Sequence, residues 1–480
     1  MRGSRGVWLP PVAGGRVRSR TLYRMLRDAL VAGALRPGDQ LPSSRRAAAD
    51  YDVSRGMIEV VYAQLADEGF LARGVGRGTF VAAHGVPTAG ASRLRSHPPG
   101  LSARGRRLAE NAACREPERA RPFHAGVADT SEFPWRLWQR LHARALRDAG
   151  GDALRFADPR GLPALRQSIA RHLAQFRGIA CRPGQVVVFN SAQQALHALA
   201  MLLLERGDAV WLEDPCYPGA RAALELVGAS ITPVPVDAHG MRVEDGVRAE
   251  PRARLAYVTP SHQYPTGVTM SLERRVALLD WARRRRAWIV EDDYDGEFRY
   301  AGQPPTPLAS LDPRAPVLVV GTLSKAMFVS LRLAYVVVPE GLVEPLANVR
   351  TQLDGFTPVA PQLATSLFID EGWFAPHLRR MRSLYGARHA ALVEALQPLR
   401  LLGWHWPDVA AGLHLLLRHP DGAAVRRIAA AADLELATLG PYRARRARDD
   451  GLFLRFGGLD VPAIRAGAAE LVRVAGRVMG

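Results

Sequence analysis

The sequence predicts a multidomain protein: a small helical unit closed by a β-hairpin, followed by a larger α/β domain on a mostly parallel sheet. Three observations support this. The 480 residues exceed the usual length of one domain. Residues 20–82 show helical spacing and then a glycine turn, whereas apolar runs alternate with helical stretches from about residue 122. Between them, residues 83–121 hold prolines, glycines and eight arginines without periodicity, which is typical of a flexible linker.

The first unit, residues 15–82, has the pattern of two short helices followed by a wing. Pro42-Ser43-Ser44 offers an N-cap for a helix over 45–50, and Ser54 caps the next one. Residues 70–73 and 79–81 flank a glycine-rich turn and predict a hairpin. Two helices joined by a brief turn, with a hairpin behind them, indicate a winged helix-turn-helix.

The second domain, residues 122–480, alternates strands with helices. We expect a large lobe over about 150–345 and a smaller, helix-rich lobe from 346–480 with 122–149. Continuous apolar strands separated by helices indicate a parallel sheet buried on both faces. The predicted strands are 186–189, 209–212, 255–258, 288–290, 317–320 and 333–338.

Composition narrows the class of protein. Hydrophobic residues make up 48% and charged residues 23%, as in soluble globular proteins. The longest apolar stretch, 186–204, is interrupted by polar residues, and no apolar run follows the basic N-terminus, so we expect neither a membrane span nor a secretory signal. Cys114, Cys181 and Cys216 show no disulfide or metal spacing. We therefore expect a cytoplasmic protein.

The N-terminal quarter of the chain is strongly basic. Residues 1–121 contain 21 arginines against 10 acidic residues, an excess of 11. An arginine-rich genome would explain such an excess equally well. A basic unit nevertheless suits a polyanionic partner such as DNA, because phosphates attract arginine at long range.

Polar groups follow two of the predicted strands at their carboxyl ends, where α/β sheets bind ligands. Asn190–Gln194 opens a helix after the 186–189 strand, and a helix N-terminus favours phosphate. Glu291–Asp295 follows another strand; one carboxylate there could pair with a protonated ring nitrogen, although a solvated acidic turn is the alternative. A metal site lacks local His or Cys ligands.

Lys325 is the only lysine in the chain. A lysine amine forms an imine with an aldehyde, and the guanidinium of arginine does not. Chance retention is the competing explanation. Together with a phosphate-binding helix start and a carboxylate for a ring nitrogen, Lys325 indicates pyridoxal 5′-phosphate as a cofactor.

The segments TPSHQYPTG, EDDYDGEFRY and GTLSKAMFVSLRLAY resemble the aminotransferase half of MocR/GabR-type regulators. LRPGDQLPSSR, VSR and GRGTFV are similar to the GntR-type winged helix that begins those proteins. The resemblance covers residues 20–82 and 122–480. It implies a fold-type-I aminotransferase domain that binds pyridoxal phosphate, and a head-to-tail homodimer with exchanged DNA-binding domains.

The resemblance also implies roles for individual residues. Lys325 would form the internal aldimine, Asp292 would pair with the pyridine nitrogen, and Tyr294 would contact the ring 3′-oxygen. The other expected cofactor contacts are His262 or Gln263 near the ring, Tyr217 beside it, and Ala192, Gln193, Ser324 and Arg332 at the phosphate. Arg455 would hold an effector carboxylate. The expected DNA contacts are Ser44, Arg45, Ser54, Arg55, Arg77 and Thr79.

Four positions depart from the family pattern. Phe156 stands where a tyrosine usually donates to the partner subunit's phosphate, Ser191 replaces a glycine, and Val329 replaces a proline. Gly56 takes the place of a longer polar residue in the recognition helix. These departures bear on phosphate affinity and on the DNA sequence that is read.

We expect a transcriptional regulator that binds double-stranded DNA and responds to an amino acid, an amine or pyridoxal phosphate. The first alternative is a working aminotransferase with an accessory N-terminal unit. A further alternative is a DNA-binding protein whose second domain is a scaffold without cofactor. The resemblance identifies neither the effector nor the operator.

Overall fold

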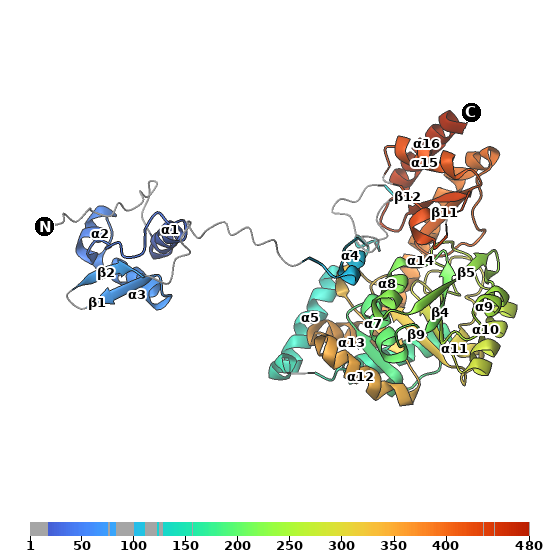
Figure 1. Cartoon of the computed structure of the whole chain (residues 1–480), viewed down its shortest axis with the longest axis horizontal. Helices are drawn as coiled ribbons and strands as arrows, with labels where there is room; N and C mark the ends of the chain where they lie inside the picture. The colour runs from blue at the N-terminus through green and yellow to red at the C-terminus, as the bar shows by residue number, and fades with distance from the viewer. Residues whose placement is uncertain are drawn as a thin grey trace. The chain divides into compact units, whose positions relative to one another are not determined.

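The computed structural model describes residues 18–74, 77–82, 100–110, 122–123, 128–155, 157–434, 436–445 and 447–479. The chain divides into two compact units, Met1–Gly100 and Leu101–Gly480 (Figure 1). We call them the first and the second unit.

The first unit contains three helices and a hairpin. They are α1 (Ser19–Val31), α2 (Ser44–Asp50), α3 (Arg55–Asp67), β1 (Leu71–Gly74) and β2 (Gly78–Val81). The hydroxyls of Ser43 and Ser54 cap α2 and α3 by accepting from the amides of Arg46 and Met57, as an N-cap serine does. The antiparallel pair β1–β2 forms the wing. The predicted winged helix-turn-helix is confirmed.

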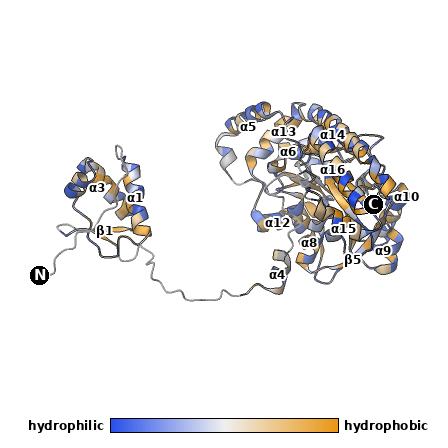
Figure 2. Ribbon diagram, turned by 90° about the horizontal axis from the view of Figure 1, so that it is seen from above, coloured by the Kyte–Doolittle hydropathy of each residue, from blue (hydrophilic) through white to orange (hydrophobic). Residues whose placement is uncertain are grey.

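The core of the first unit comes from one face of each helix. Leu22, Leu26 and Leu30 of α1 are fully buried and belong to one cluster with Ile58 and Leu65 of α3. Apolar and polar residues are mixed along α1 and α3 (Figure 2), and the buried leucines of α1 recur every four residues, which places them on one face, as in an amphipathic helix.

The predicted linker contains a helix. Residues 103–110 form α4 (Ala103–Glu110), whereas the sequence pattern predicted irregular structure throughout 83–121. Ser102 precedes the helix, and its hydroxyl accepts from the Gly105 amide at 3.0 Å. This local cap stabilises about two helical turns. The sequence of α4 has no apolar stripe from which the helix could have been predicted. Residues 83–99 and 111–121 lie outside the described residues.

The large lobe of the second unit is built on an eight-stranded sheet in the order β3-β10-β9-β8-β7-β4-β5-β6. β10 runs antiparallel to both β3 and β9, and β6 runs antiparallel to β5, while the other strands are parallel. The strands are β3 (Val186–Phe189), β4 (Ala209–Asp214), β5 (Ser230–Asp237), β6 (Gly240–Met241), β7 (Leu255–Val258), β8 (Trp288–Asp293), β9 (Val317–Thr322) and β10 (Ala334–Val337). All six predicted strands are present.

Both faces of this sheet are buried. Val186 and Val188 of β3 belong to one core cluster, and Val187 and Phe189 belong to another. Alternate residues of a strand point to opposite faces, so a continuous apolar strand is needed wherever helices cover both. The α-helices of the second unit between residues 135 and 370 are α5 (Trp135–Ala149), α6 (Pro163–His172), α7 (Ala192–Leu203), α8 (Pro218–Val227), α9 (Val243–Ala249), α10 (Leu272–Arg285), α11 (Leu308–Leu311), α12 (Glu340–Asp354) and α13 (Val359–Asp370).

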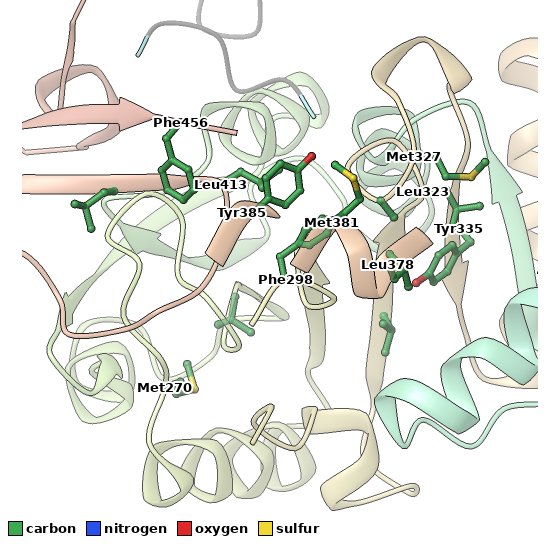
Figure 3. Close-up of a cluster of buried hydrophobic side chains, with 14 of the residues drawn as sticks. Met270, Phe298, Leu323, Met327, Tyr335, Leu378, Met381, Tyr385, Leu413 and Phe456 are labelled. Carbon is green, nitrogen blue, oxygen red and sulfur yellow. The ribbon is translucent and has the colours of Figure 1, made fainter. Parts of the chain in front are cut away.

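The small lobe is an α+β layer joined to the large lobe by a shared core. Its antiparallel sheet has the order β11-β13-β12. Its elements are α14 (Phe374–Leu396), β11 (His414–His419), α15 (Gly422–Ala431), β12 (Ala437–Thr438), β13 (Asp450–Arg455) and α16 (Val461–Met479). At the junction, Phe298 packs on Tyr385 of α14 with ring centroids 5.0 Å apart, and Leu413 and Phe456 lie in the same cluster (Figure 3).

Among the described residues, no helix combines the length and the apolarity that crossing a bilayer requires.

Candidate cofactor and effector site

The predicted site residues converge at one edge of the large sheet. β4, β7, β8 and β9 are neighbours and run parallel, so their carboxyl ends lie side by side. Asp292 lies at the end of β8, and Lys325 follows Thr322 of β9. Tyr217 and His262 follow the ends of β4 and β7. Residues far apart in the chain therefore meet at one place.

Within the part of the chain that the structure describes, Asp292 is a buried carboxylate of which one oxygen is hydrogen-bonded and the other is not. Its Oδ2 accepts a hydrogen bond from the Tyr257 hydroxyl at 2.7 Å. Its Oδ1 is buried and has no hydrogen-bond partner among the described residues. Burial raises the pKa of Asp292 to about 7. The hydrogen bond from Tyr257 lowers this pKa, and the nearby charges of Asp293 and Asp295 raise it. A protonated pyridine nitrogen would supply the donor and the charge that Oδ1 lacks, so the residues present fit pyridoxal phosphate.

Tyr294 and His262 lie next to Asp292, where the ring oxygen of the cofactor is expected. The Tyr294 hydroxyl is 2.9 Å from His262 Nδ1, and that nitrogen is 2.8 Å from Asp295 Oδ2. Burial, followed by the charge of Asp295, raises the pKa of Tyr294 well above its ordinary value. Tyr294 therefore stays a neutral hydroxyl that can donate a hydrogen bond.

Gln263 has its amide engaged by the loop that carries it. Nε2 donates to Glu213 Oε2 at 3.1 Å and to the Pro215 carbonyl at 2.9 Å, and Oε1 accepts from the Thr266 hydroxyl at 2.6 Å. These bonds fix the shape of the 259–267 loop. A direct contact with the cofactor stays a prediction.

Tyr264, which sequence reasoning did not single out, lies at the centre of the site. Its ring centroid is 5.7 Å from those of Tyr217 and Tyr294, and 5.4 Å from that of His414. Burial raises the pKa of its hydroxyl, and Arg455 opposes this shift. Tyr264 stands in the TPSHQYPTG segment, so its position in that motif was the available signal.

Arg455 lies on the small lobe, next to Tyr264. Its Nη2 donates to the Tyr442 hydroxyl at 3.2 Å, and its guanidinium carbon is 4.7 Å from the centroid of the Phe453 ring. His414 of β11 is directly opposite Arg455 of β13, so both side chains share one face of the small sheet. An arginine framed by aromatic rings can bind a carboxylate.

The segment that carries Tyr442 is bonded to the large lobe. We call residues 440–444 the 440–444 loop. The Tyr442 carbonyl accepts from the Cys216 amide at 3.0 Å, and the Ala444 amide donates to Asp214 Oδ1 at 2.9 Å. Arg221 donates to the carbonyl of Arg443 at 3.3 Å. Arg455 is thus connected through Tyr442 to the contact between the lobes.

The expected phosphate end is the start of α7. The Ser191 hydroxyl accepts from the Gln194 amide at 3.1 Å, so this departure from the family pattern caps the helix. Gln193 Nε2 donates to the Gly219 carbonyl at 2.8 Å, and its Oε1 is buried without a partner among the described residues. A Cβ on Gly219 would stand 2.1 Å from that Oε1 and 2.5 Å from the Tyr217 ring. Only glycine permits this close approach. Ala192 is the first residue of the helix.

The remaining predicted residues lie on the β9–β10 connection. Lys325 is half-buried. The Ser324 amide donates to the Thr322 hydroxyl at 3.2 Å. Val329 begins a single 3₁₀ turn (Val329–Leu331), and Arg332 follows it with a φ of 52° and an exposed side chain. Phe156 lies outside the described residues. Phosphate binding by Ser324 and Arg332 stays a prediction.

Arg177 is bonded to the segment that follows Asp292, and the sequence analysis did not identify it. Its Nε and Nη2 donate to the two oxygens of Asp293 at 2.7 and 2.8 Å, and its Nη1 donates to the Gly296 carbonyl at 3.1 Å. Arg177 is 6% exposed. The bonds fix the backbone just after Asp292. No local pattern marks Arg177, because its partner lies more than a hundred residues away.

The predicted DNA contacts lie on α2, α3 and the wing of the first unit. Arg45, Arg55 and Arg77 are exposed, as is the capping residue Ser54. The Ser44 hydroxyl accepts from Arg55 Nε at 3.3 Å, which joins α2 to the start of α3. In the wing, Thr79 is partly buried and its carbonyl accepts from the Leu41 amide at 2.8 Å. A Cβ at Gly56 would meet no atom within 4 Å.

Fold and site together define a class: a winged-helix unit for binding DNA, joined to a domain with the aminotransferase fold. Residues 18–81 match the bacterial regulatory proteins of the gntR family, and residues 130–436 match aminotransferase class I and II. LysN, an α-aminoadipate aminotransferase of Thermus thermophilus solved with N-(5′-phosphopyridoxyl)-L-leucine, superposes with a TM-score of 0.67 at 27% identity, over 74% of this chain and 92% of that one.

Relatives span both units. The chain is 37% identical to the probable rhizopine catabolism regulatory protein MocR of Rhizobium meliloti, over 94% of this chain and 92% of that protein. It is 30% identical to the pyridoxine biosynthesis regulator PdxR of Corynebacterium glutamicum, over 94% of each. The chain belongs to the MocR-type family of transcriptional regulators, in which a GntR-type DNA-binding domain precedes an aminotransferase-like domain.

Proposed function

We propose that this regulator binds pyridoxal phosphate at the edge of the large sheet and senses an amino acid, an amine or the cofactor itself there. The unpaired Oδ1 of buried Asp292 is the observation that carries the proposal, because it calls for a charged donor at the expected place of the pyridine nitrogen. When bound, pyridoxal phosphate supplies an aldehyde that condenses with amines. Lys325 would hold it, and Tyr294 would donate to its ring oxygen.

Arg455 and Tyr442 provide a route from effector to lobe position. A carboxylate arriving at Arg455 would compete with the Tyr442 hydroxyl for the guanidinium. Because the 440–444 loop is bonded to Cys216 and Asp214, its displacement would change how the lobes close. An effector shifts such an equilibrium by its differential affinity for the two arrangements.

The DNA-binding end would act through a homodimer. Two winged helices on an exchanged, head-to-tail dimer would contact operator DNA with Arg45, Ser54, Arg55, Arg77, Thr79 and Ser44. The cytoplasm is the compartment in which both DNA and pyridoxal phosphate are available to it.

The test compares the wild type with Lys325→Ala and Lys325→Arg. We expect both variants to lose the visible absorbance band that pyridoxal phosphate acquires on condensing with a lysine, because arginine keeps the charge but not the chemistry. Footprints on the DNA upstream of the gene should respond to amines and amino acids in the wild type and not in the variants. An unchanged spectrum in Lys325→Arg would overturn the assignment of Lys325.

A catalytically competent aminotransferase is the second candidate, favoured by the presence of Lys325, Asp292 and Arg455 among the residues expected at the site. Single-turnover spectra with a panel of amino acids separate the two. Sequence-specific DNA protection without turnover supports the sensor. Sustained turnover without an effect on DNA binding supports the enzyme.

A further inference from the structure

His262 and Asp295 form a buried pair directly behind the Tyr294 hydroxyl. His262 is 5% exposed and Asp295 is 4% exposed. Nδ1 of His262 is 2.8 Å from Asp295 Oδ2 and 2.9 Å from the Tyr294 hydroxyl. A single ring nitrogen therefore faces two oxygens. The resemblance to known regulators placed His262 only near the cofactor ring and gave Asp295 no role.

The chemistry of the three groups decides where the protons lie. An ionised carboxylate only accepts, so Asp295 favours the tautomer of His262 that carries its proton on Nδ1. An Nδ1 that donates to Asp295 cannot accept the proton of Tyr294. The acceptors left for that proton are Asp295, which is also within hydrogen-bond reach of Tyr294, and the ring oxygen of a bound cofactor; by engaging Asp295, His262 favours the cofactor oxygen.

We propose that His262 and Asp295 are positioning residues that keep the Tyr294 hydroxyl aimed as a donor at the cofactor's ring oxygen. The pair thereby lowers the pKa of the Lys325 nitrogen when that nitrogen is joined to the cofactor. This inference rests on the proposed binding of pyridoxal phosphate and adds to it a determinant of the protonation state.

The small lobe closes over this pair. A Cβ on Gly412 would stand 2.1 Å from His262 Cε1 and 2.8 Å from Asp295 Oδ2, so the backbone there lies against both side chains. The Gly412 amide donates to the Phe298 carbonyl at 2.8 Å, which fastens this segment to the large lobe. The His414 ring lies 5.0 Å from that of His262. The orientation of Tyr294 is thus tied to a docked small lobe.

A cation site is the competing interpretation of the same cluster. One ligand atom each from His262, Asp295 and His414 lies within 4.8 Å of the others. However, the Nδ1 of His262 and the carboxylate of Asp295 already satisfy each other without an ion. Burial, with His262 and Arg455 next, lowers the pKa of His414 well below its ordinary value, so it adds no second positive charge.

Other titratable groups surround the pair, and they must be unchanged in the test. They are Asp292 at the end of β8, Tyr294 just after it, Tyr264 after β7, Lys325 after β9, Tyr300, His389 of α14, His414 of β11 and Arg455 of β13. None of these groups is altered in the three single variants that the titration compares.

The experiment is a spectrophotometric pH titration of the full-length protein loaded with pyridoxal phosphate. We expect His262→Phe to raise the pH midpoint of the visible absorbance change by about one pH unit, because Asp295, no longer bonded to His262, then competes more strongly for the Tyr294 hydroxyl and the ring oxygen loses its donor. His262→Asn keeps an N–H near the position of Nδ1 and should stay near the wild type. The exposed His239→Phe is the control for surface substitution.

The outcomes separate the inference from the proposed function. Absence of a visible band in the wild type defeats both. If the pH midpoint of the band's titration is the same in His262→Phe and in the wild type, the inference fails and the proposed function stands. A shift that persists unchanged when Tyr294→Phe is added overturns the route through Tyr294. A midpoint that moves on addition of Zn²⁺ to the wild type, and not to His262→Phe, supports the cation site instead.

Discussion

In the first unit the predicted contact residues Arg45, Arg55 and Arg77 are exposed, whereas in the second unit Asp292 and His262 are buried. The DNA-binding surface needs only its helices and wing in place, and each residue acts from the surface. The cofactor site needs charged side chains inside the protein. Because burial disfavours an unpaired charge, each of these side chains is paired with another group or has a shifted pKa. Substitutions of these contact residues should therefore affect DNA binding alone in the first unit, and substitutions of the buried charges should affect stability together with binding in the second.

The sharpest test of this contrast is Arg177→Ala in the second unit. It leaves Asp293 as an unpaired buried charge, and breaking a buried ion pair costs about 3–5 kcal/mol. We expect a matching fall in the free energy of unfolding, measured by urea denaturation. The exposed Arg283→Ala, which breaks bonds to Asp280 and Asp312, should cost less than about 1 kcal/mol. Equal effects would contradict the contrast.

The pH dependence of stability offers a second test on the cofactor-free protein. Burial raises the pKa of Glu213, Glu291 and Asp292 to about 7, while carboxyl groups of the unfolded chain have a pKa of about 4. These three carboxyls then bind more protons in the folded state between these values, so their contribution to stability falls as pH rises from about 5 to about 8, whereas His389 and His414, whose pKa values burial lowers, oppose this at the acidic end. Thermal unfolding across this range checks the sign. Asp292→Asn should flatten the slope, and a steeper slope would refute the assigned burial.

Arg77→Ala should act on DNA binding alone. Loss of one phosphate contact weakens affinity and lowers the slope of log K against log salt by about 1. Binding to operator DNA at several salt concentrations measures this, and unfolding should be unchanged. An unaltered slope would remove Arg77 from the interface.

Gly56→Ala should have the smallest effect. No atom lies within 4 Å of a Cβ at this position, and alanine is favoured over glycine inside a helix by up to about 1 kcal/mol. We expect a slight rise in the melting temperature of the first unit. A loss of stability would mean that the start of α3 is less regular than described.

The two units also differ in how far sequence could predict them. Ser43 and Ser54 mark the helix starts of the first unit because a cap acts on residues two or three positions away. β5 escaped prediction because Pro233 and Pro235 interrupt it; prolines are tolerated near the edge of a sheet, and only β6 lies beyond. α4 escaped because its sequence has no apolar stripe and Ser102 alone marks its start.

Within the site, sequence reasoning found residues that carry chemistry in local motifs, such as Lys325 and Asp292. It missed Arg177, Tyr442 and Tyr257, because each acquires its role only through a partner brought near by the fold. Tyr257 resembled one more apolar residue of β7. The contact of its hydroxyl with Asp292 depends on the register between β7 and β8.

Gly412 shows how strictly such a site constrains evolution. Its φ of 73° excludes most side chains, and any Cβ would enter the space of His262. A saturation library scored for effector response should find almost no tolerated replacement here, although glycine supplies no functional group. The same library built on His262→Ala would reveal whether loss of the imidazole releases this position, in which case the two positions can change only in a fixed order.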